Sequence, residues 1–165
     1  MSSQLGERRR AGRWCYGPDE GGPAFTRDLL EMFIRWSAEL PRQNYQLAVI
    51  ERTSAQELIG CAGVRCAGFD GGVAELGIEL APRCWGRGLA TEAAGALVGF
   101  AFRDLGVQAL VAISVTENGR VARVLSKLGF RPAGTRAGSD WMRARGWSET
   151  EWRLTAEAWR STNPG

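Results

Sequence analysis

The spacing of apolar positions alternates along the chain between the period of a helix and that of a strand. In residues 25–40 the apolar side chains recur every three or four positions, which predicts a helix that Thr26 caps and Pro41 stops. Two runs of β-type residues follow at 45–51 and 57–66, separated by a short polar connection. We expect these two runs to pair as a hairpin.

The segment VAELGIEL, residues 73–80, has the alternation of a strand. This alternation places one set of side chains on one face (Ala74, Leu76, Ile78 and Leu80) and a second set on the other (Val73, Glu75, Gly77 and Glu79). Pro82 ends the strand, and a helix with an apolar stripe and several small residues is predicted over 89–105, ending at Gly106. A strand, a glycine-containing loop and a helix therefore follow one another directly.

The rest of the chain continues this alternation. Further elements are expected in the order strand 109–115, helix 121–128 closed by Gly129, strand 130–136, strand 149–154 and a short helix at 155–160. The complete order predicts a mixed α/β sheet layered with helices. No internal repeat divides the chain, so we expect a single domain over 1–165, in which residues 1–23 form a loose N-terminal arm.

Charge and hydropathy narrow the possible functions. The 21 basic and 18 acidic residues are spread along the chain and leave a net charge of +3, which argues against nucleic acid as the main partner. No apolar run reaches the roughly 18 residues of a membrane span, and the first residues lack the continuous apolar segment of a signal peptide. We therefore expect a cytoplasmic protein that binds neither nucleic acid nor membrane.

The chain contains no histidine, and its four cysteines show no CxxC spacing. The lack of histidine excludes nucleophilic schemes that pair serine or cysteine with a histidine base. The cysteine spacing supports neither a zinc site nor a disulfide framework, so no metal is expected.

Two glycines one residue apart, Gly86 and Gly88, stand in the loop before the helix at 89–105. The first N–H groups of a helix have no intrahelical partner, and glycines allow an anion to approach them. Arg83 and Arg87 would add positive charge. A structural turn is the competing interpretation, because about three such glycine pairs arise by chance at this glycine content.

Two familiar nucleotide-binding motifs are absent from this loop. Thr91 occupies the third glycine position of the dinucleotide fingerprint, and the chain has no P-loop. A diphosphate held only by a GxG loop between a strand and a helix is the arrangement expected for coenzyme A.

The segment ELGIELAPRCWGRGLATEA, followed by VTENGRVARVLSKLGFRPAGTR, resembles the GNAT superfamily of acetyl-CoA-dependent N-acetyltransferases. The family's R/Q-x-x-G-x-G-G/A loop corresponds to Arg83, Gly86, Gly88 and Ala90. The family's downstream asparagine corresponds to Asn118. Within the superfamily, WGRGLATEA resembles the branch that contains the ribosomal-protein N-terminal acetyltransferases RimJ and RimL, and the likeness covers residues 45–135.

This resemblance implies an α/β fold of the GNAT α+β type, with a mixed, mostly antiparallel sheet, a splayed central strand pair and flanking helices. It implies transfer of an acetyl group from acetyl-CoA to a primary amine, either a protein N-terminal α-amine or a small-molecule amine, by direct attack in a ternary complex. The residues that would bind acetyl-CoA are Ile78, Leu80, Arg83, Gly86, Arg87, Gly88, Leu89, Ala90, Asn118 and Arg123.

Glu75 is the candidate catalytic base. It projects from one face of strand 73–80 and corresponds to a strand glutamate that serves as base in some family members. Glu79, on the same face, is the alternate. An ion-paired or solvated strand carboxylate is the competing interpretation.

The sequence departs from the family at the positions that usually protonate the departing thiolate. Leu125 stands where many members have tyrosine, and Val121 stands where the RimJ/RimL-like branch often has serine. Ser114 and Ser126 are possible substitutes, each with a structural role as the competing interpretation. These departures leave open an alternative function, a non-catalytic acyl-CoA-binding or regulatory protein of the same fold.

The front end also departs from the family, whose members usually begin with a strand and a helix before the helix predicted at 25–40. The first strand is therefore expected to be short or missing. Homodimers are common in the family, which makes a homodimer a possible assembly.

Overall fold

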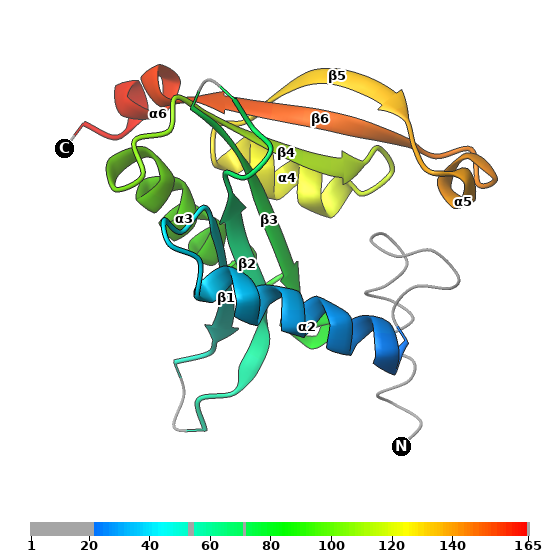
Figure 1. The fold of residues 1–165 in the computed structure, drawn as a ribbon. Coiled ribbons are helices and arrows are strands. Elements are labelled where there is room, and N and C mark those ends of the chain that lie inside the picture. The colour runs from blue at the N-terminus through cyan, green and yellow to red at the C-terminus, as the bar shows by residue number, and fades with distance from the viewer. Residues whose placement is uncertain (1–21, 53–54, 71, 165) are drawn as a thin grey trace.

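A computed structural model describes residues 22–52, 55–70 and 72–164 (Figure 1). Along the chain, the helices and strands are α2 (Pro23–Ser37), β1 (Asn44–Ile50), β2 (Leu58–Arg65), β3 (Val73–Leu80), α3 (Leu89–Arg103), β4 (Ala109–Val115), α4 (Gly119–Lys127), β5 (Arg131–Ala137), α5 (Asp140–Arg143), β6 (Ser148–Thr155) and α6 (Ala156–Thr162). A 3-10 turn, η1 (Pro82–Cys84), lies between β3 and α3.

The described strands form one sheet in the order β1-β2-β3-β4-β6-β5. Neighbouring strands are antiparallel except β3 and β4, which run parallel. These two strands pair only at Val73–Ala109, Ala74–Leu110 and Glu75–Val111, and then diverge (Figure 1). The predicted fold class, a mostly antiparallel sheet with a splayed central pair, is confirmed.

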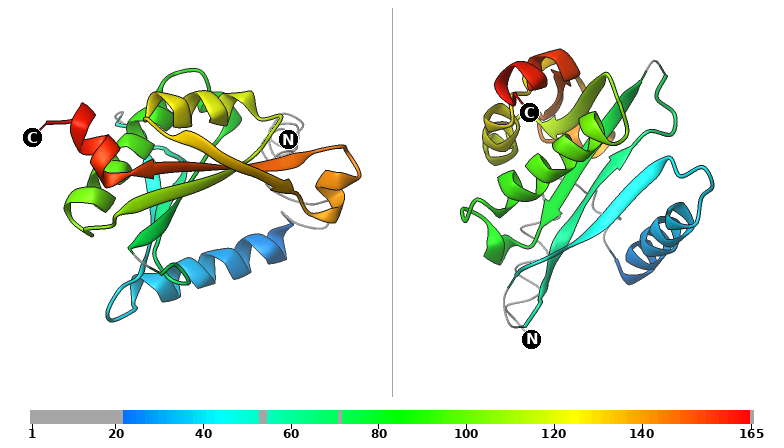
Figure 2. Two further views of the ribbon diagram at one scale, coloured as in Figure 1. Left: turned by 90° about the horizontal axis from the view of Figure 1, so that it is seen from above. Right: turned by 90° about the vertical axis from the view of Figure 1, so that its left-hand side faces the viewer.

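Helices cover both faces of the sheet. Figure 2 shows α2 and α3 on opposite sides, and α2 contacts β1 while α3 contacts β2 and β3. The alternation predicted for β3 explains this arrangement, because Ala74 and Leu76 are buried in the core beneath α3 and Glu75 lies on the other face.

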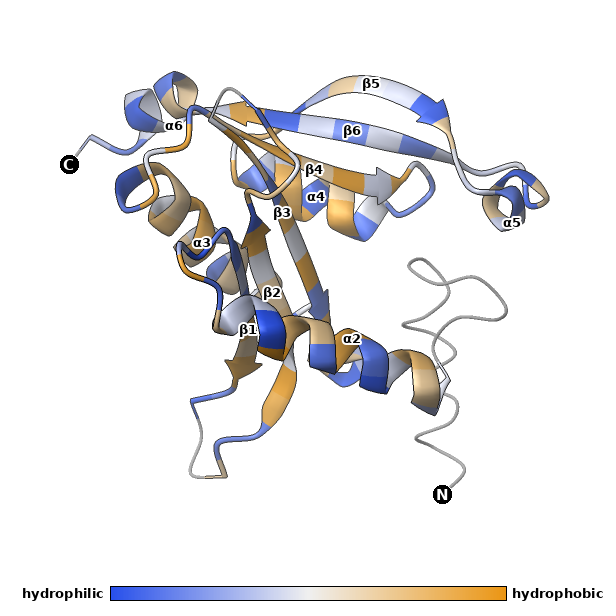
Figure 3. Ribbon diagram, viewed as in Figure 1, coloured by the Kyte–Doolittle hydropathy of each residue, from blue (hydrophilic) through white to orange (hydrophobic). Residues whose placement is uncertain are grey.

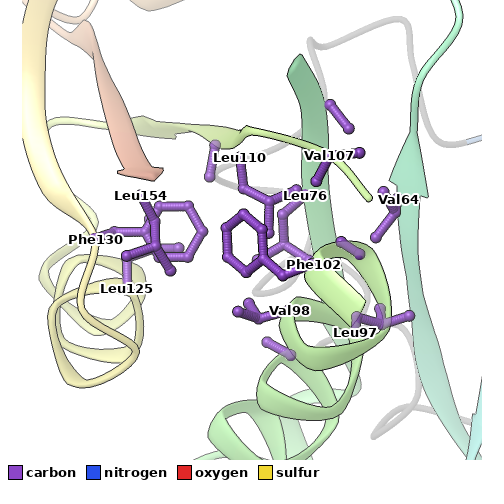
Figure 4. Close-up of a cluster of buried hydrophobic side chains, with 14 of the residues drawn as sticks. Val64, Leu76, Leu97, Val98, Phe102, Val107, Leu110, Leu125, Phe130 and Leu154 are labelled. Carbon is purple, nitrogen blue, oxygen red and sulfur yellow. The ribbon is translucent and has the colours of Figure 1, made fainter. Parts of the chain in front are cut away.

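The main core lies between α3, α4 and the centre of the sheet (Figure 4). Phe130 and Leu110 are completely buried there, and Phe102 and Leu125 are almost completely buried. Figure 3 shows the same distribution, with hydrophobic residues concentrated on α3 and β4 and mostly polar residues on β5. Burial at about 25 cal/mol per Å² of apolar surface makes this cluster the main source of stability.

The predicted and observed elements differ at the first helix and at the far end of the sheet. Thr26 does not cap α2, because the helix begins earlier at Pro23 with Gly22 as its N-cap. Proline suits the first helical position, where its missing N–H would have no intrahelical partner. The four-residue helix α5 is too short to produce a recognisable apolar period and was not predicted.

Two predictions concern residues outside the described part of the chain. They are the short or missing first strand and, except for residues 22 and 23, the loose arm at 1–23. No helix in the described part of the chain combines the length and apolar character needed to cross a membrane.

Candidate functional site

The loop between β3 and α3 is anchored by its own backbone and by Trp85. The Trp85 indole N–H donates a 2.8 Å hydrogen bond to the carbonyl of Leu80, at the end of β3. Cys84 is buried against Ile59 and Leu80, as expected for a small apolar residue. The guanidinium of Arg120, in the first turn of α4, lies 4.9 Å from the centre of the Trp85 ring. Trp85 thus connects the loop to the end of β3 and to the first turn of α4.

Both glycines of the GxG pair adopt left-handed backbone conformations, with φ values of 78° at Gly86 and 82° at Gly88. Residues with a Cβ rarely adopt these angles. Apart from the adjoining residues, no atom of the described part of the chain lies within 4 Å of the position where a Cβ would stand on either glycine, so both border open space there. The glycines are therefore required by the turn and leave room beside it.

Gly88 is the N-cap of α3 and provides no side chain to receive the first N–H groups of the helix. The N–H groups of Leu89, Ala90 and Thr91, in the first turn, have no intrahelical partner. These groups carry the partial positive charge of the helix terminus next to the open space at the glycines. This geometry fits a phosphate group.

Both arginines of this loop are engaged by glutamates from the end of the β1–β2 hairpin. Arg83 contacts Glu57, with 2.6 Å between the guanidinium nitrogen and the carboxylate oxygen. Arg87 donates to both carboxylate oxygens of Glu51. The hydrogen bond and the charge of Glu51 raise the pKa of Arg87. Sequence reasoning assigned both arginines to the cofactor and missed these carboxylates.

The splay between β3 and β4 begins after Glu75, and its open end lies at the end of β3 where this loop starts. Ile78, which is half-buried, and Leu80, which is buried, lie on the part of β3 that no longer pairs with β4. On its β4 side, the backbone of β3 from Leu76 to Leu80 has no strand partner. Ile78 and Leu80 remain predicted cofactor-binding positions.

Asn118 is the N-cap of α4, and its side-chain oxygen Oδ1 accepts a 3.4 Å hydrogen bond from the backbone N–H of Val121. Its side chain is half-buried at the end of β4. Arg123 is exposed on α4, and its Nε donates to the carbonyl of Gly119. Asn118 therefore has a structural role in addition to the predicted contact with the cofactor.

The residues at the usual proton-donor positions are apolar and belong to the core. Leu125 is only 3% exposed, and Val121 packs against the same cluster. Ser114 is buried and accepts a 3.0 Å hydrogen bond from the indole of Trp152, whereas Ser126 is exposed on α4. No tyrosine lies on α4.

On the other face of the sheet, Glu75 is ion-paired with Arg65 of β2 at 2.5 Å, and both side chains are about one-third exposed. The antiparallel register places the two residues opposite each other. The same register places Glu79 opposite Cys61. We call Gln46, Cys61, Arg65, Glu75 and Glu79 the outer-face cluster.

Two polar atoms of the outer-face cluster are buried without a hydrogen-bond partner among the described residues: Gln46 Oε1 and Arg65 Nε. A Cβ on Gly63 would stand 2.4 Å from Gln46 Oε1, and a Cβ on Gly77 would stand 2.8 Å from the Arg65 guanidinium. The paired glycines therefore provide the flat surface on which these two side chains lie. Alternation and hairpin pairing are the sequence signals that could have found this cluster.

The thiol of Cys61 has its pKa raised, first by burial and then by the charge of Glu79. A hydrogen bond with Gln46 and the charge of Arg65 act in the opposite direction. Cys61 is therefore mostly a neutral thiol near pH 7 and a poor nucleophile. Among the residues described, no three acidic or cysteine side chains come together as a metal site.

Comparison with known proteins agrees with this geometry. A family model described as "Acetyltransferase (GNAT) domain" matches residues 4–131. An uncharacterized N-acetyltransferase of Bacillus subtilis (strain 168), YoaA, is 35% identical over 85 residues, which is 52% of this chain and 48% of that protein. A second uncharacterized N-acetyltransferase, p20 of Bacillus licheniformis, is 29% identical over 109 residues, 66% of this chain and 60% of that protein. The matches thus span about half to three-fifths of these relatives.

Solved structures share the fold at low sequence identity. A probable acetyltransferase superposes with a TM-score of 0.78 at 18% identity, covering 94% of this chain and 84% of that one. The spermidine N-acetyltransferase of Vibrio cholerae, solved in complex with CoA and spermine, has a TM-score of 0.72 at 14% identity and covers 94% of this chain and 88% of its own. From the loop geometry, the splayed strands and the family match over residues 4–131, we conclude that this chain belongs to the GNAT acetyltransferase family.

Proposed function

We propose that this protein transfers an acetyl group from acetyl-CoA to a primary amine by direct attack in a ternary complex. The observation that carries the proposal is the uncapped N-terminus of α3 beside two left-handed glycines, at the mouth of the splay between β3 and β4. The carboxylate of Glu75 lies on the face of β3 that points away from the core beneath α3, at the residue where β3 and β4 begin to diverge.

The pyrophosphate of acetyl-CoA would accept hydrogen bonds from the backbone between Gly86 and Ala90. The pantetheine arm would follow the unpaired part of β3 near Ile78 and Leu80. The side-chain NH₂ group of Asn118 would donate to this arm, because the side-chain oxygen Oδ1 is the atom that caps α4. Arg123 would flank the cofactor from α4. The thioester supplies an activated acetyl group.

On the acceptor side, Glu75 would take a proton from the substrate ammonium, directly or through one water. The neutral amine then forms a bond to the acetyl carbon while the carbon–sulfur bond breaks and the electron pair leaves on sulfur. The acetylated nitrogen gives up its extra proton to water to become a neutral amide. A backbone N–H of β3 would polarise the thioester carbonyl. Because Val121 and Leu125 cannot donate a proton, the thiolate would be protonated by water after it leaves.

The outer-face cluster supports an amine as the acceptor. Its carboxylates, Glu75 and Glu79, lie on one face of β3 and favour a cationic substrate. A protein N-terminal α-amine, as in the RimJ/RimL-like branch, and a small-molecule amine both satisfy this chemistry. We further propose a cytoplasmic location, on the hydropathy pattern of the chain, and a homodimer, on the family resemblance alone.

A non-catalytic acyl-CoA-binding protein is the second candidate function. Two observations favour it. The position of the usual proton donor is taken by Leu125, an apolar side chain buried in the core. Arg65 donates a hydrogen bond to one carboxylate oxygen of Glu75, the candidate base. Release of free thiol from acetyl-CoA, measured across a panel of peptides and polyamines, separates the two candidates. Acceptor-dependent release supports catalysis, and tight CoA binding with no release across the panel supports the second candidate.

CoA is expected to stabilise the folded protein. At 100 times its dissociation constant, a ligand that binds only the folded state adds about 2.7 kcal/mol to the free energy of unfolding. For a chain of this length that corresponds to a rise in Tm of about 5–10 °C. A thermal-shift titration with CoA measures this effect, with adenosine as the control that lacks the pyrophosphate. An unchanged Tm at millimolar CoA would contradict the proposed cofactor site.

Replacing Val121 with serine is expected to raise kcat several-fold. The substitution places a hydroxyl at the branch's usual donor position, on a half-buried site in the first turn of α4. Steady-state thiol release measures kcat, and Val121→Ala is the matched control that shortens the side chain without adding a donor. Equal rates for the two variants would mean that protonation of the thiolate does not limit turnover.

A further inference from the structure

We infer that Glu51 and Glu57 compete with the CoA pyrophosphate for the two arginines of the cofactor loop. The inference rests on the proposed function, because it assumes that CoA binds at Gly86–Ala90. It assigns a role in setting cofactor affinity to two acidic residues of the β1–β2 hairpin that lie outside the family's loop motif.

The contacts leave each arginine in a defined pair. Arg87 donates from both terminal nitrogens to Glu51, one of these bonds measuring 3.4 Å, and Arg83 reaches Glu57 at 2.6 Å and the carbonyl of Leu58 at 3.4 Å. A carboxylate paired with a guanidinium uses the same charge-assisted bonds that a phosphate would use. A phosphate can therefore bind these arginines only by displacing or sharing the glutamates.

The two glutamates are held as a unit on the hairpin. The backbone N–H of Glu51 donates a 2.9 Å hydrogen bond to the carbonyl of Glu57, directly across the hairpin. The Glu51 side chain is only 17% exposed, whereas Arg87 is 49% exposed. The carboxylate is thus the more enclosed partner, and the arginine is the more solvent-exposed one.

This arrangement sets the affinity of the site. While the pairs persist, the charge that each arginine offers to an anion is largely balanced, and the attraction for the pyrophosphate comes mainly from the N-terminus of α3. Partly exposed ion pairs are weak, so a diphosphate can displace the glutamates. The glutamates therefore reduce CoA affinity without blocking the site.

The test is isothermal titration of the full chain with CoA, comparing wild type, Glu51→Gln and Glu57→Gln. Each substitution is expected to tighten CoA binding about two- to fivefold, the range that corresponds to the strength of a partly exposed ion pair. Pantetheine, which lacks the pyrophosphate, should bind all three proteins equally. Asp140→Asn is the matched control, because it removes one negative charge and one arginine pair at α5, at the far end of the β5–β6 hairpin (Figure 1).

A double-mutant cycle with Arg87→Gln separates competition from simple charge repulsion. If Glu51 acts by holding Arg87, the gain from Glu51→Gln disappears when Arg87 is already glutamine. A gain that persists without Arg87, or a loss of affinity in Glu51→Gln, would overturn the inference. Wild-type protein that binds no CoA at all would instead overturn the proposed function.

Discussion

Gly88→Val is expected to abolish measurable CoA binding. Gly88 has a φ of 82° and caps α3, so a β-branched residue there would either strain the backbone or move the first turn of the helix. Its side chain would also enter the open space beside the helix N–H groups. Losing two charge-assisted hydrogen bonds at about 1.5–3 kcal/mol each weakens binding by at least about 100-fold. Isothermal titration with CoA measures the change.

Gly106→Val is the matched control for this experiment. Gly106 lies just beyond the other end of α3 and has a φ of 67°. Among the residues that the structure describes, only its chain neighbours come within 4 Å of the position that a Cβ would take. Both variants should therefore lose similar stability, seen as a lower Tm, but only Gly88→Val should lose CoA. Normal CoA affinity in a folded Gly88→Val protein would contradict the position of the cofactor loop.

Glu75→Gln is expected to lower kcat by about 10²–10⁴-fold, the usual contribution of a general base, while changing CoA affinity less than about twofold. Glutamine keeps an oxygen that can accept the hydrogen bond from Arg65, so the fold should be retained. The ion pair itself is partly exposed and contributes no more than about 1 kcal/mol. Thiol release under saturating substrates and CoA titration give the two readouts.

Glu79→Gln is the comparison that tests the assignment of the base. It removes a carboxylate from the same face of β3, four pairs along the register from Glu75, opposite Cys61. If Glu75 is the base, Glu79→Gln should mainly raise the KM for a cationic acceptor. A larger loss of kcat in Glu79→Gln than in Glu75→Gln would transfer the role to Glu79.

Local patterns were sufficient to predict the elements around the site. The strands at 73–80 and 109–115 have the bounds that their apolar patterns predicted. The alternation in β3 also predicted which residues face the core. These features depend on neighbouring residues, whose side chains are positioned by the period of the element itself. The cap at Thr26 was wrong because Pro23 also suits a helix start, and pattern alone does not rank the two.

The cofactor loop was the part of the site most accessible to sequence reasoning. Gly86 and Gly88 stand between a strand and a helix, and the left-handed angles that the structure gives them are those that favour glycine. Their assignment to the pyrophosphate, and the assignments of Glu75 and Asn118, stay predictions until ligands and variants are measured.

The sequence by itself determined the order of the elements, the direction in which β3 presents its side chains, and the glycine turn before α3. Only the tertiary structure decided which side chains meet. It paired Arg87 with Glu51, Arg83 with Glu57 and Arg65 with Glu75, and it placed Leu125 in the core. The physical reason is that these contacts join residues up to 36 positions apart. They depend on strand register and helix packing, which the whole fold establishes and no local period encodes.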